Sequence, residues 1–196
     1  MKIECYPVFD PRRTEIETYI RDEFRRVFGA DIQPAQVPMI AARNGDGAPI
    51  AAAGLRISED GFFSEIYLDQ PIETALSDAF GAPVERNDIV EVVSLASSAP
   101  LAVLPLIEAI TEAGRRMGKR CAVFTATTPL FRLLTRTGVP LQRLTPARSD
   151  RIDRPDRWGT YYETDPWVCA LPDFRRPLAF LPPRALHRFT EICPCR

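Results

Sequence analysis

The sequence predicts a mixed α+β (α/β) protein in which an antiparallel meander precedes a strand–loop–helix–strand crossover. The first observation is the turn Asn44-Gly45-Asp46-Gly47 between two apolar segments, because Asn-Gly and Asp-Gly supply the positive φ angles of hairpin turns. The second is a β-branched strand at 89–95, followed by a small-residue loop, a helical stretch and another apolar strand. That order indicates a right-handed parallel crossover.

The first half of the chain is expected to hold a strand, a long helix and the meander. The long helix begins after Pro11, repeats apolar residues at steps of three and four, and ends at Gly29. An extended segment follows the Glu59-Asp60-Gly61 turn, and Pro71 opens a short helix. The expected strands are 3–9, 37–43, 49–57 and 62–68, and the expected helices are 12–28 and 71–80.

The second half is expected to contain the crossover and the closing part of the sheet. Its predicted segments are strand 89–95, loop 96–100, helix 101–117, strand 119–125, helix 129–137, polar loop 146–157, and closing strands at 158–162 and 168–171. Residues 1–172 then form one domain, and residues 173–196 form a proline-rich tail.

Composition excludes several classes of protein. The chain has 196 residues and a net charge of −1, which gives no electrostatic reason to expect nucleic-acid binding. Its apolar runs are too short for a transmembrane helix, and the N-terminus does not resemble a secretory signal. Five scattered cysteines and a single histidine, His187, do not suggest a metal site. We expect a reduced, metal-free, cytoplasmic protein, and the oligomeric state stays open.

Seven short motifs occur in the order found in the thermostable hemolysin family. They are Gly54-Leu55-Arg56, Phe63-Ser64-Glu65-Ile66-Tyr67-Leu68-Asp69, Pro71-Ile72-Glu73, Ile89-Val90-Glu91-Val92, Leu95-Ala96-Ser97, Phe124-Thr125-Ala126-Thr127 and Trp158-Gly159-Thr160-Tyr161-Tyr162. The chain therefore resembles this family, whose fold is similar to that of the GNAT acyltransferases and the acyl-homoserine-lactone synthases. The resemblance implies a sheet whose central strand splays from its neighbour in a V-shaped split.

By this resemblance the protein is an N-acyltransferase that moves a fatty acyl group from a thioester to a small amine or amino-acid-like acceptor. The acyl-phosphopantetheine arm is a co-substrate rather than a permanent cofactor, and six consecutive residues are expected to hold it. They are Val93, Ser94, Leu95, Ala96, Ser97 and Ser98. The loop after the central strand has neither the glycines nor the basic residue that hold the pyrophosphate of coenzyme A. Acyl carrier protein is therefore the expected donor and partner.

Glu91 is the first candidate catalytic residue. In a strand it shares a face with Ile89 and Val93, so its carboxylate points into apolar surroundings, where burial raises the pKa. Arg56, near the end of a neighbouring strand, is its expected partner. Two interpretations stay open: an ion pair that ties the two strands together, or a carboxylate that binds or deprotonates the acceptor amine.

Further candidates have competing structural roles. Glu65 is a second candidate base on a possible edge strand, and Tyr162 is a candidate acid for the leaving thiolate. The expected substrate-binding residues are Glu73, Thr125, Trp158 and Tyr161. Glu73 could instead complement a helix dipole, and the aromatic residues could belong to the core.

Two other functions stay open at this stage. One is a haemolysin-type membrane-active protein, and the other is a non-catalytic acyl-binding or regulatory module. Lactone synthesis is not expected, since the acidic residues that the lactone synthases place before the first hairpin are not evident. The arginines of helix 12–28 form either a solvated face or a surface for an acidic carrier.

Overall fold

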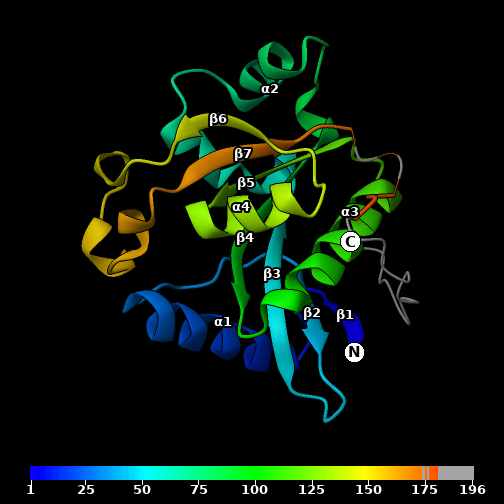
Figure 1. Ribbon diagram of the computed structural model, residues 1–196, viewed down its shortest axis with the longest axis vertical. Coiled ribbons are helices and arrows are strands. Elements are labelled where there is room, and N and C mark those ends of the chain that lie inside the picture. Colours follow the sequence, from blue (N-terminus) through cyan, green and yellow to red (C-terminus); the bar gives the residue numbers. More distant parts are fainter. Residues whose placement is uncertain (174, 176, 181–196) are drawn as a thin grey trace.

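The computed structural model describes residues 1–173, 175 and 177–180. In this part of the chain one sheet has the strand order β1-β2-β3-β4-β5-β7-β6, and only β4 and β5 run parallel (Figure 1). The strands are β1 (Lys2–Tyr6), β2 (Met39–Arg43), β3 (Pro49–Arg56), β4 (Ile89–Ser97), β5 (Cys121–Ala126), β6 (Gln142–Pro146) and β7 (Trp167–Leu171). The helices are α1 (Arg13–Phe28), α2 (Ile72–Phe80), α3 (Val103–Arg116) and α4 (Thr128–Arg136).

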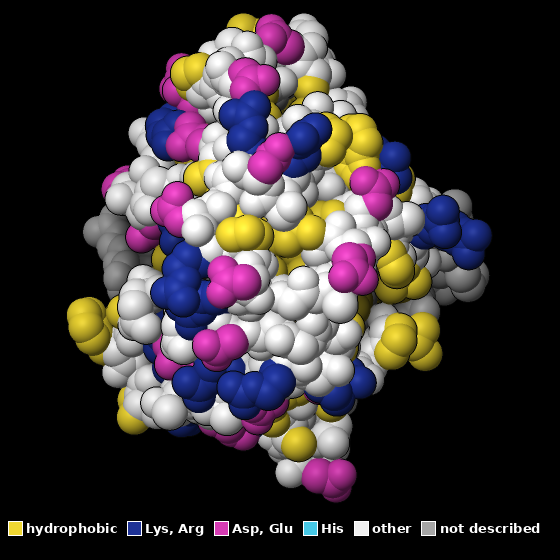
Figure 2. Space-filling view, turned by 90° about the vertical axis from the view of Figure 1, so that its left-hand side faces the viewer, with side chains coloured by type: hydrophobic (Ala, Val, Ile, Leu, Met, Phe, Trp, Pro, Cys, Tyr) yellow, Lys and Arg dark blue, Asp and Glu magenta, His cyan; other side chains and the backbone are white. Residues whose placement is uncertain are grey.

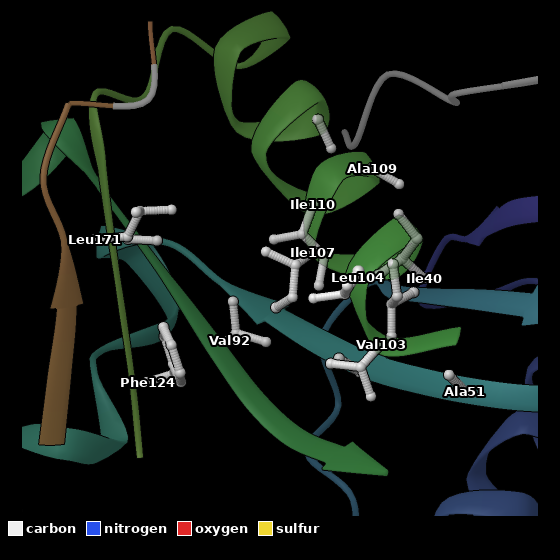
Figure 3. Close-up of a cluster of buried hydrophobic side chains, with 14 of the residues drawn as sticks. Ile40, Ala51, Val92, Val103, Leu104, Ile107, Ala109, Ile110, Phe124 and Leu171 are labelled. Atoms are coloured by element: carbon white, nitrogen blue, oxygen red, sulfur yellow. The ribbon is translucent and has the colours of Figure 1, made fainter. Parts of the chain in front are cut away.

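Helices cover both faces of the sheet. Helices α3 and α4 pack on one face, where Leu104, Ile107 and Ile110 of α3 lie against Val92 and Phe124 (Figure 3). Helix α1 packs its buried stripe on the other face, and α2 covers that same face farther along the sheet. No helix in the described part is long and apolar enough to span a bilayer.

The predicted hairpin and crossover are confirmed. At the tip of the hairpin, the backbone N–H of Asn44 donates to the carbonyl oxygen of Ala48, and Gly47 has a φ of 85°. Beyond the hairpin, β4, α3 and β5 form the expected parallel crossover. The mixed sheet predicted from the sequence is therefore present.

Two local predictions need correction, and one strand lies where none is expected. Residues 62–68 are not a strand; Phe63–Tyr67 form a 3-10 helix. Residues 158–162 are not a strand either, since the 3-10 helices Pro155–Trp158 and Tyr161–Thr164 occupy that region. Strand β6 was not predicted, whereas the closing strand at 168–171 is confirmed as β7. Most of the predicted tail, with His187, Cys193 and Cys195, lies outside the described residues.

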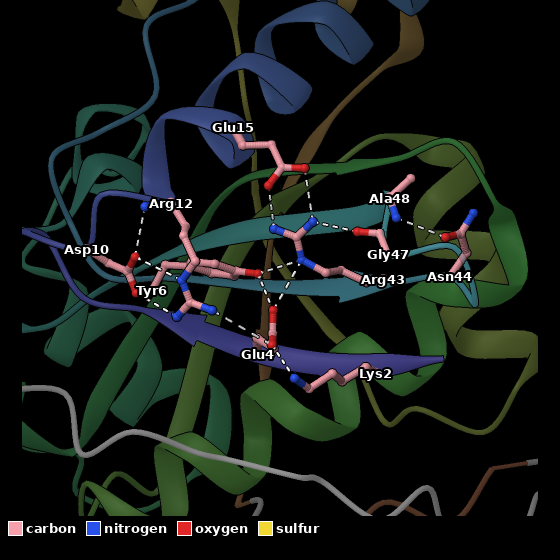
Figure 4. Close-up of polar contacts among 10 residues, drawn as sticks. All are labelled: Lys2, Glu4, Tyr6, Asp10, Arg12, Glu15, Arg43, Asn44, Gly47 and Ala48. Carbon is pink, nitrogen blue, oxygen red and sulfur yellow. Dashed lines mark hydrogen bonds and ion pairs between the residues drawn. The ribbon is translucent and has the colours of Figure 1, made fainter.

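A network of charges fastens the edge of the sheet to α1 (Figure 4). Arg43 on β2 donates to Glu4 on β1 and to Glu15 at the start of α1, at 3.2 and 2.6 Å. Glu4 also accepts from Lys2 and from the Tyr6 hydroxyl. Hydrogen bonds from Lys2 and Tyr6 are the main reason that the pKa of Glu4 falls to about 2. The ionised form of Glu4 therefore stabilises the folded state.

We expect Glu4→Gln to reduce the acid sensitivity of the fold. The pKa of Glu4 is lower in the folded than in the unfolded chain, so its contribution is present above about pH 4.5 and is lost as the pH falls toward 2. At most about 3 kcal/mol is involved, with less expected because the group is partly solvated. Urea unfolding from pH 7 to 2 measures it. A stability difference between wild type and variant that is independent of pH would contradict this assignment.

Candidate active site

The sheet splits between β4 and β5. These strands pair from Ile89 with Cys121 to Val92 with Phe124, and the pairing ends there although both strands continue. On the other side of β4 the register with β3 shifts, so that two β4 residues lie opposite Ala53. One of them, Ser94, has a φ of 52°, which marks a β-bulge. The predicted V-shaped split beside Val93 is therefore present.

A cavity of about 1020 Å³ occupies this split. One part lies between β4 and the helices α3 and α4, where its lining is apolar: Val103, Phe124, Pro129, Leu130 and Leu133. The other part lies toward the C-terminal end of α1 and the segment 151–161. Because the lining comes from both sides of the sheet, the cavity reaches from one face to the other through the split. We call it the cleft.

The cleft residues toward α1 are aromatic and polar. Trp158 stacks on Phe63 with ring centroids 6.1 Å apart, and Tyr161 stacks on Phe24 at 6.2 Å. Seen from the left-hand side of Figure 1, the surface has hydrophobic side chains at its centre, among acidic and basic ones (Figure 2). Arg151, Arg154 and other charged residues line this part of the cleft. It can therefore take a ligand with both apolar and charged groups.

The turn at Gly159 holds the segment with Trp158 and Tyr161 against α1. The N–H of Thr160 donates to the carbonyl oxygen of Phe28, and the N–H of Asp31 donates to that of Arg157. Gly159 has a φ of 52°, and a Cβ there would lie 2.0 Å from the oxygen of Phe28. Only glycine fits such a position.

Gly159→Ala should therefore destabilise the protein and open this wall of the cleft. The positive φ and the clash together should cost about 3 kcal/mol or more. Chemical unfolding measures the loss, and Gly45→Ala is the matched control, because a Cβ at Gly45 meets nothing within 4 Å. Equal stability of the two variants would contradict the close approach of Gly159 to the carbonyl oxygen of Phe28.

Glu91 is buried, with 1% of its surface exposed, and it lines the cleft. Its Oε2 accepts from the N–H of Phe63 at 2.6 Å, and its Oε1 accepts from the N–H and hydroxyl of Ser64 at 2.7 and 2.6 Å. Burial raises the pKa of Glu91, although these hydrogen bonds partly offset the effect. The carboxylate thus holds segment 63–67 in place, and Oε2 keeps one acceptor position for a ligand.

Arg56 lies opposite Glu91 in the register of β3 and β4, but within the described residues the two form no ion pair. The expected ion pair is thus not formed, although the charge of Arg56 partly offsets the rise that burial causes in the pKa of Glu91. Instead, Nη1 of Arg56 donates to the carbonyl oxygens of Asp60 and Gly61 at 3.3 and 3.2 Å. Its Nε is buried without a hydrogen-bond partner, and the residue lines the cleft.

Most of the residues predicted from the sequence reach the cleft. The ones that line it are Glu91, Arg56, Val93, Ser94, Leu95, Ala96, Ser97, Thr125, Trp158 and Tyr161. Glu65 and Glu73 are not among the lining residues; both bind Arg86, with oxygens 2.6 and 2.9 Å from its Nη1. This ion-pair cluster joins α2 to the 3-10 helix and explains both carboxylates without a ligand.

Two other predicted residues, Tyr162 and Ser98, do not line the cleft. The hydroxyl of Tyr162 lies 2.6 Å from that of Tyr67, and it is Tyr67 that lines the cleft. Ser98 is held by the hydroxyl of Tyr19 and the carbonyl oxygen of Ile50. Phe63 and Tyr67 were not singled out from the sequence, because their alternation with Glu65 suggested a strand.

We expect Glu91→Gln to destabilise the fold. A glutamine amide can replace one oxygen as an acceptor, but its NH₂ group would then face the N–H of Phe63, and one donor would stay buried without a partner. That should cost about 1–3 kcal/mol. Chemical unfolding measures it against Glu163→Gln, an exposed residue. If the two variants prove equally stable, Glu91 does not hold segment 63–67.

Comparison with known proteins identifies the family. The family model described as "Thermostable hemolysin" matches residues 7–173. The chain belongs to the thermostable hemolysin family. No curated protein sequence matches it significantly.

Several solved structures share the fold of this hemolysin-family chain. The acyl-homoserine-lactone synthase LasI is 13% identical, with 87% of this chain and 88% of that chain covered and a TM-score of 0.60. The coenzyme-A-dependent lactone synthase BjaI is 14% identical, with coverages of 89% and 84% and a TM-score of 0.56. FeeM, an N-acyl amino acid synthase from uncultured soil microbes, is 12% identical, with coverages of 88% and 95% and a TM-score of 0.54. At these identities the likeness shows the GNAT-like fold.

Proposed function

We propose that the protein is an N-acyltransferase that transfers a fatty acyl group from a carrier-bound thioester to an amine. The observation that carries this proposal is the split after Val92, which opens a cavity through the sheet. Similar structures include two acyl-homoserine-lactone synthases and an N-acyl amino acid synthase. The names of these proteins describe products in which an acyl group is bound to nitrogen. An acyl thioester and an amine can meet in such a cleft from opposite faces of the sheet.

The two parts of the cleft differ in polarity, and so do the two proposed substrates. The apolar part beside α3 and α4 suits an acyl chain, whose burial contributes about 0.8 kcal/mol for each CH₂ group. Beyond Val92, the backbone groups of β4 that face β5 have no strand partner there. These groups suit the amide groups of a pantetheine arm and the oxyanion of the tetrahedral intermediate.

In the reaction, the amine nitrogen attacks the thioester carbonyl carbon, the C–S bond breaks and the thiolate leaves. The nitrogen loses a proton, and the thiolate gains one. Glu91 has a raised pKa and one free acceptor position at Oε2, so we assign it the binding and deprotonation of the amine. The N–H groups of Phe63 and Ser64 orient its carboxylate for this role.

Carrier protein is favoured over coenzyme A by the loop after β4. Coenzyme A enzymes of this fold bind pyrophosphate with free backbone N–H groups at the start of the following helix. Here the N–H of Ser98 already donates to Tyr19 and Ile50, and the N–H of Ala99 donates to the hydroxyl of Ser97. These two N–H groups of the loop before the helix are therefore not available to a phosphate.

A basic surface beside the donor part of the cleft suits an acidic carrier. The sequence has no Asp or Glu between Glu112 and Asp150. Arg132 and Arg136 on α4 and Arg143 on β6 are exposed, and within the described residues they form no ion pair. We call these three residues the α4 surface. By contrast, the arginines of α1 mostly pair with acids of their own segment, as Arg26 does with Glu23 at 2.6 Å.

Incubation with octanoyl carrier protein and a mixture of amines and amino acids should release free carrier thiol and form octanoyl amides. Mass spectrometry detects the amides, and a thiol reagent measures the rate. Octanoyl-coenzyme A should be a poorer donor. No amide with either donor, at any acceptor, would refute acyl transfer.

Charge reversal tests the docking surface separately. The double variant Arg132→Glu/Arg136→Glu should raise the KM for octanoyl carrier protein about tenfold or more, because association depends on charge complementarity. Its rate with octanoyl-pantetheine, which has no protein surface, should not change. The change Arg25→Glu on α1 serves as control. If Arg25→Glu raises the KM as much as the double variant does, the carrier does not dock on the α4 surface.

A further inference from the structure

Two side-chain atoms in the described part of the chain are buried without any hydrogen-bond partner: Arg56 Nε and Thr125 Oγ1. Both residues line the cleft. Buried polar groups are nearly always hydrogen-bonded, because an unmade bond leaves the cost of desolvation uncompensated. Two such atoms on residues that line one cavity mark a place where a bound ligand would meet unused hydrogen-bonding groups.

The strand register places both residues on the same face of the sheet. Arg56 pairs with Glu91 across β3 and β4, and Glu91 pairs with Val123 across β4 and β5. Paired residues share a face, and Thr125 follows Val123 by two positions, so Thr125 lies on that face as well. It is also the first β5 residue beyond the last pair with β4, at the point where the split begins.

Arg56 brings a positive charge to this face. It forms no ion pair in the part of the chain that the structure describes, and its two hydrogen bonds go to neutral carbonyl oxygens. Glu91, which lies opposite it across β3 and β4, accepts hydrogen bonds from residues 63 and 64 rather than from Arg56. A guanidinium with an unused, buried N–H is a strong site for an anionic oxygen.

We propose that Arg56 and Thr125 form a carboxylate-binding subsite, and that the acceptor is therefore an amino acid rather than a simple amine. This proposal rests on the acyl-transfer function proposed above. The carboxylate of the acceptor accepts hydrogen bonds from Arg56 Nε and Thr125 Oγ1, while its amine lies at Oε2 of Glu91. The side chain of the acceptor lies against the aromatic wall of Phe24, Phe63 and Trp158.

The test compares two products that differ only in the carboxylate. N-octanoyl-phenylalanine and N-octanoyl-2-phenylethylamine share the acyl chain, the amide and the ring. Isothermal titration calorimetry should show that the wild-type protein binds the first about 10- to 100-fold more tightly. Arg56→Gln should remove this preference by weakening only the carboxylate compound. Arg56→Lys, which keeps the charge, should retain part of it.

Thr125→Val separates binding from folding. The hydroxyl of Thr125 has no partner in the protein, so removing it should leave the melting temperature unchanged or raise it. The same variant should bind N-octanoyl-phenylalanine about 3- to 10-fold less tightly and bind the phenylethylamine compound as before. Arg116→Gln, on the exposed end of α3, is the control for loss of a guanidinium.

The outcomes distinguish the two proposals. Equal affinity of wild type for the two compounds, or an equal loss for both in Arg56→Gln, overturns the carboxylate subsite but leaves acyl transfer standing. The second result would indicate that Arg56 contacts the amide oxygen shared by both compounds. A clear carboxylate preference without any turnover from acyl donors would support the subsite and refute the enzyme.

Discussion

The divergence of β4 from β5 is the constraint on which the rest of the site depends. Two parallel strands normally satisfy each other's backbone groups along their whole length, and here they stop at Val92 and Phe124. The bulge at Ser94 turns β4 away, and β3 follows because Gly54 has no Cβ; one placed there would lie 2.9 Å from Val93. A cavity through a sheet becomes possible only because these two features occur on adjacent strands.

The face of the open sheet is covered by other segments of the chain, and Glu91 holds these segments in place. Its carboxylate takes two backbone N–H groups and one hydroxyl from residues 63 and 64, and this anchors the 3-10 helix over the face. Phe63 then stacks on Trp158, whose segment hydrogen-bonds to the end of α1. A single buried acid thus connects the central strand to a wall built from three distant parts of the chain.

The sequence predicts the structure well where local residues determine it. It predicts the structure poorly where contacts between distant residues determine it. The hairpin at Asn44 and the crossover were predicted, since turn dipeptides and β-branched runs act locally. Segment 62–68 alternates like a strand, yet two of its N–H groups donate to Glu91, which lies 28 and 27 positions away. Arg86 likewise explains Glu65 and Glu73, which the sequence alone had suggested for the site. Arg56 could be singled out, but nothing local shows that its Nε lacks a partner.

The stability of the fold alone does not explain the polar groups of the cleft. A hydrophobic residue at Thr125 would avoid burying an unused hydroxyl, and a partner for Arg56 Nε would avoid burying an unused N–H, so folding stability alone favours neither arrangement. Glu65, Glu73 and Arg86, outside the cleft, are joined to one another by hydrogen bonds and ion pairs. The contrast between a paired cluster and unpartnered donors within one domain supports our proposal that ligand binding occurs at the split rather than on α2.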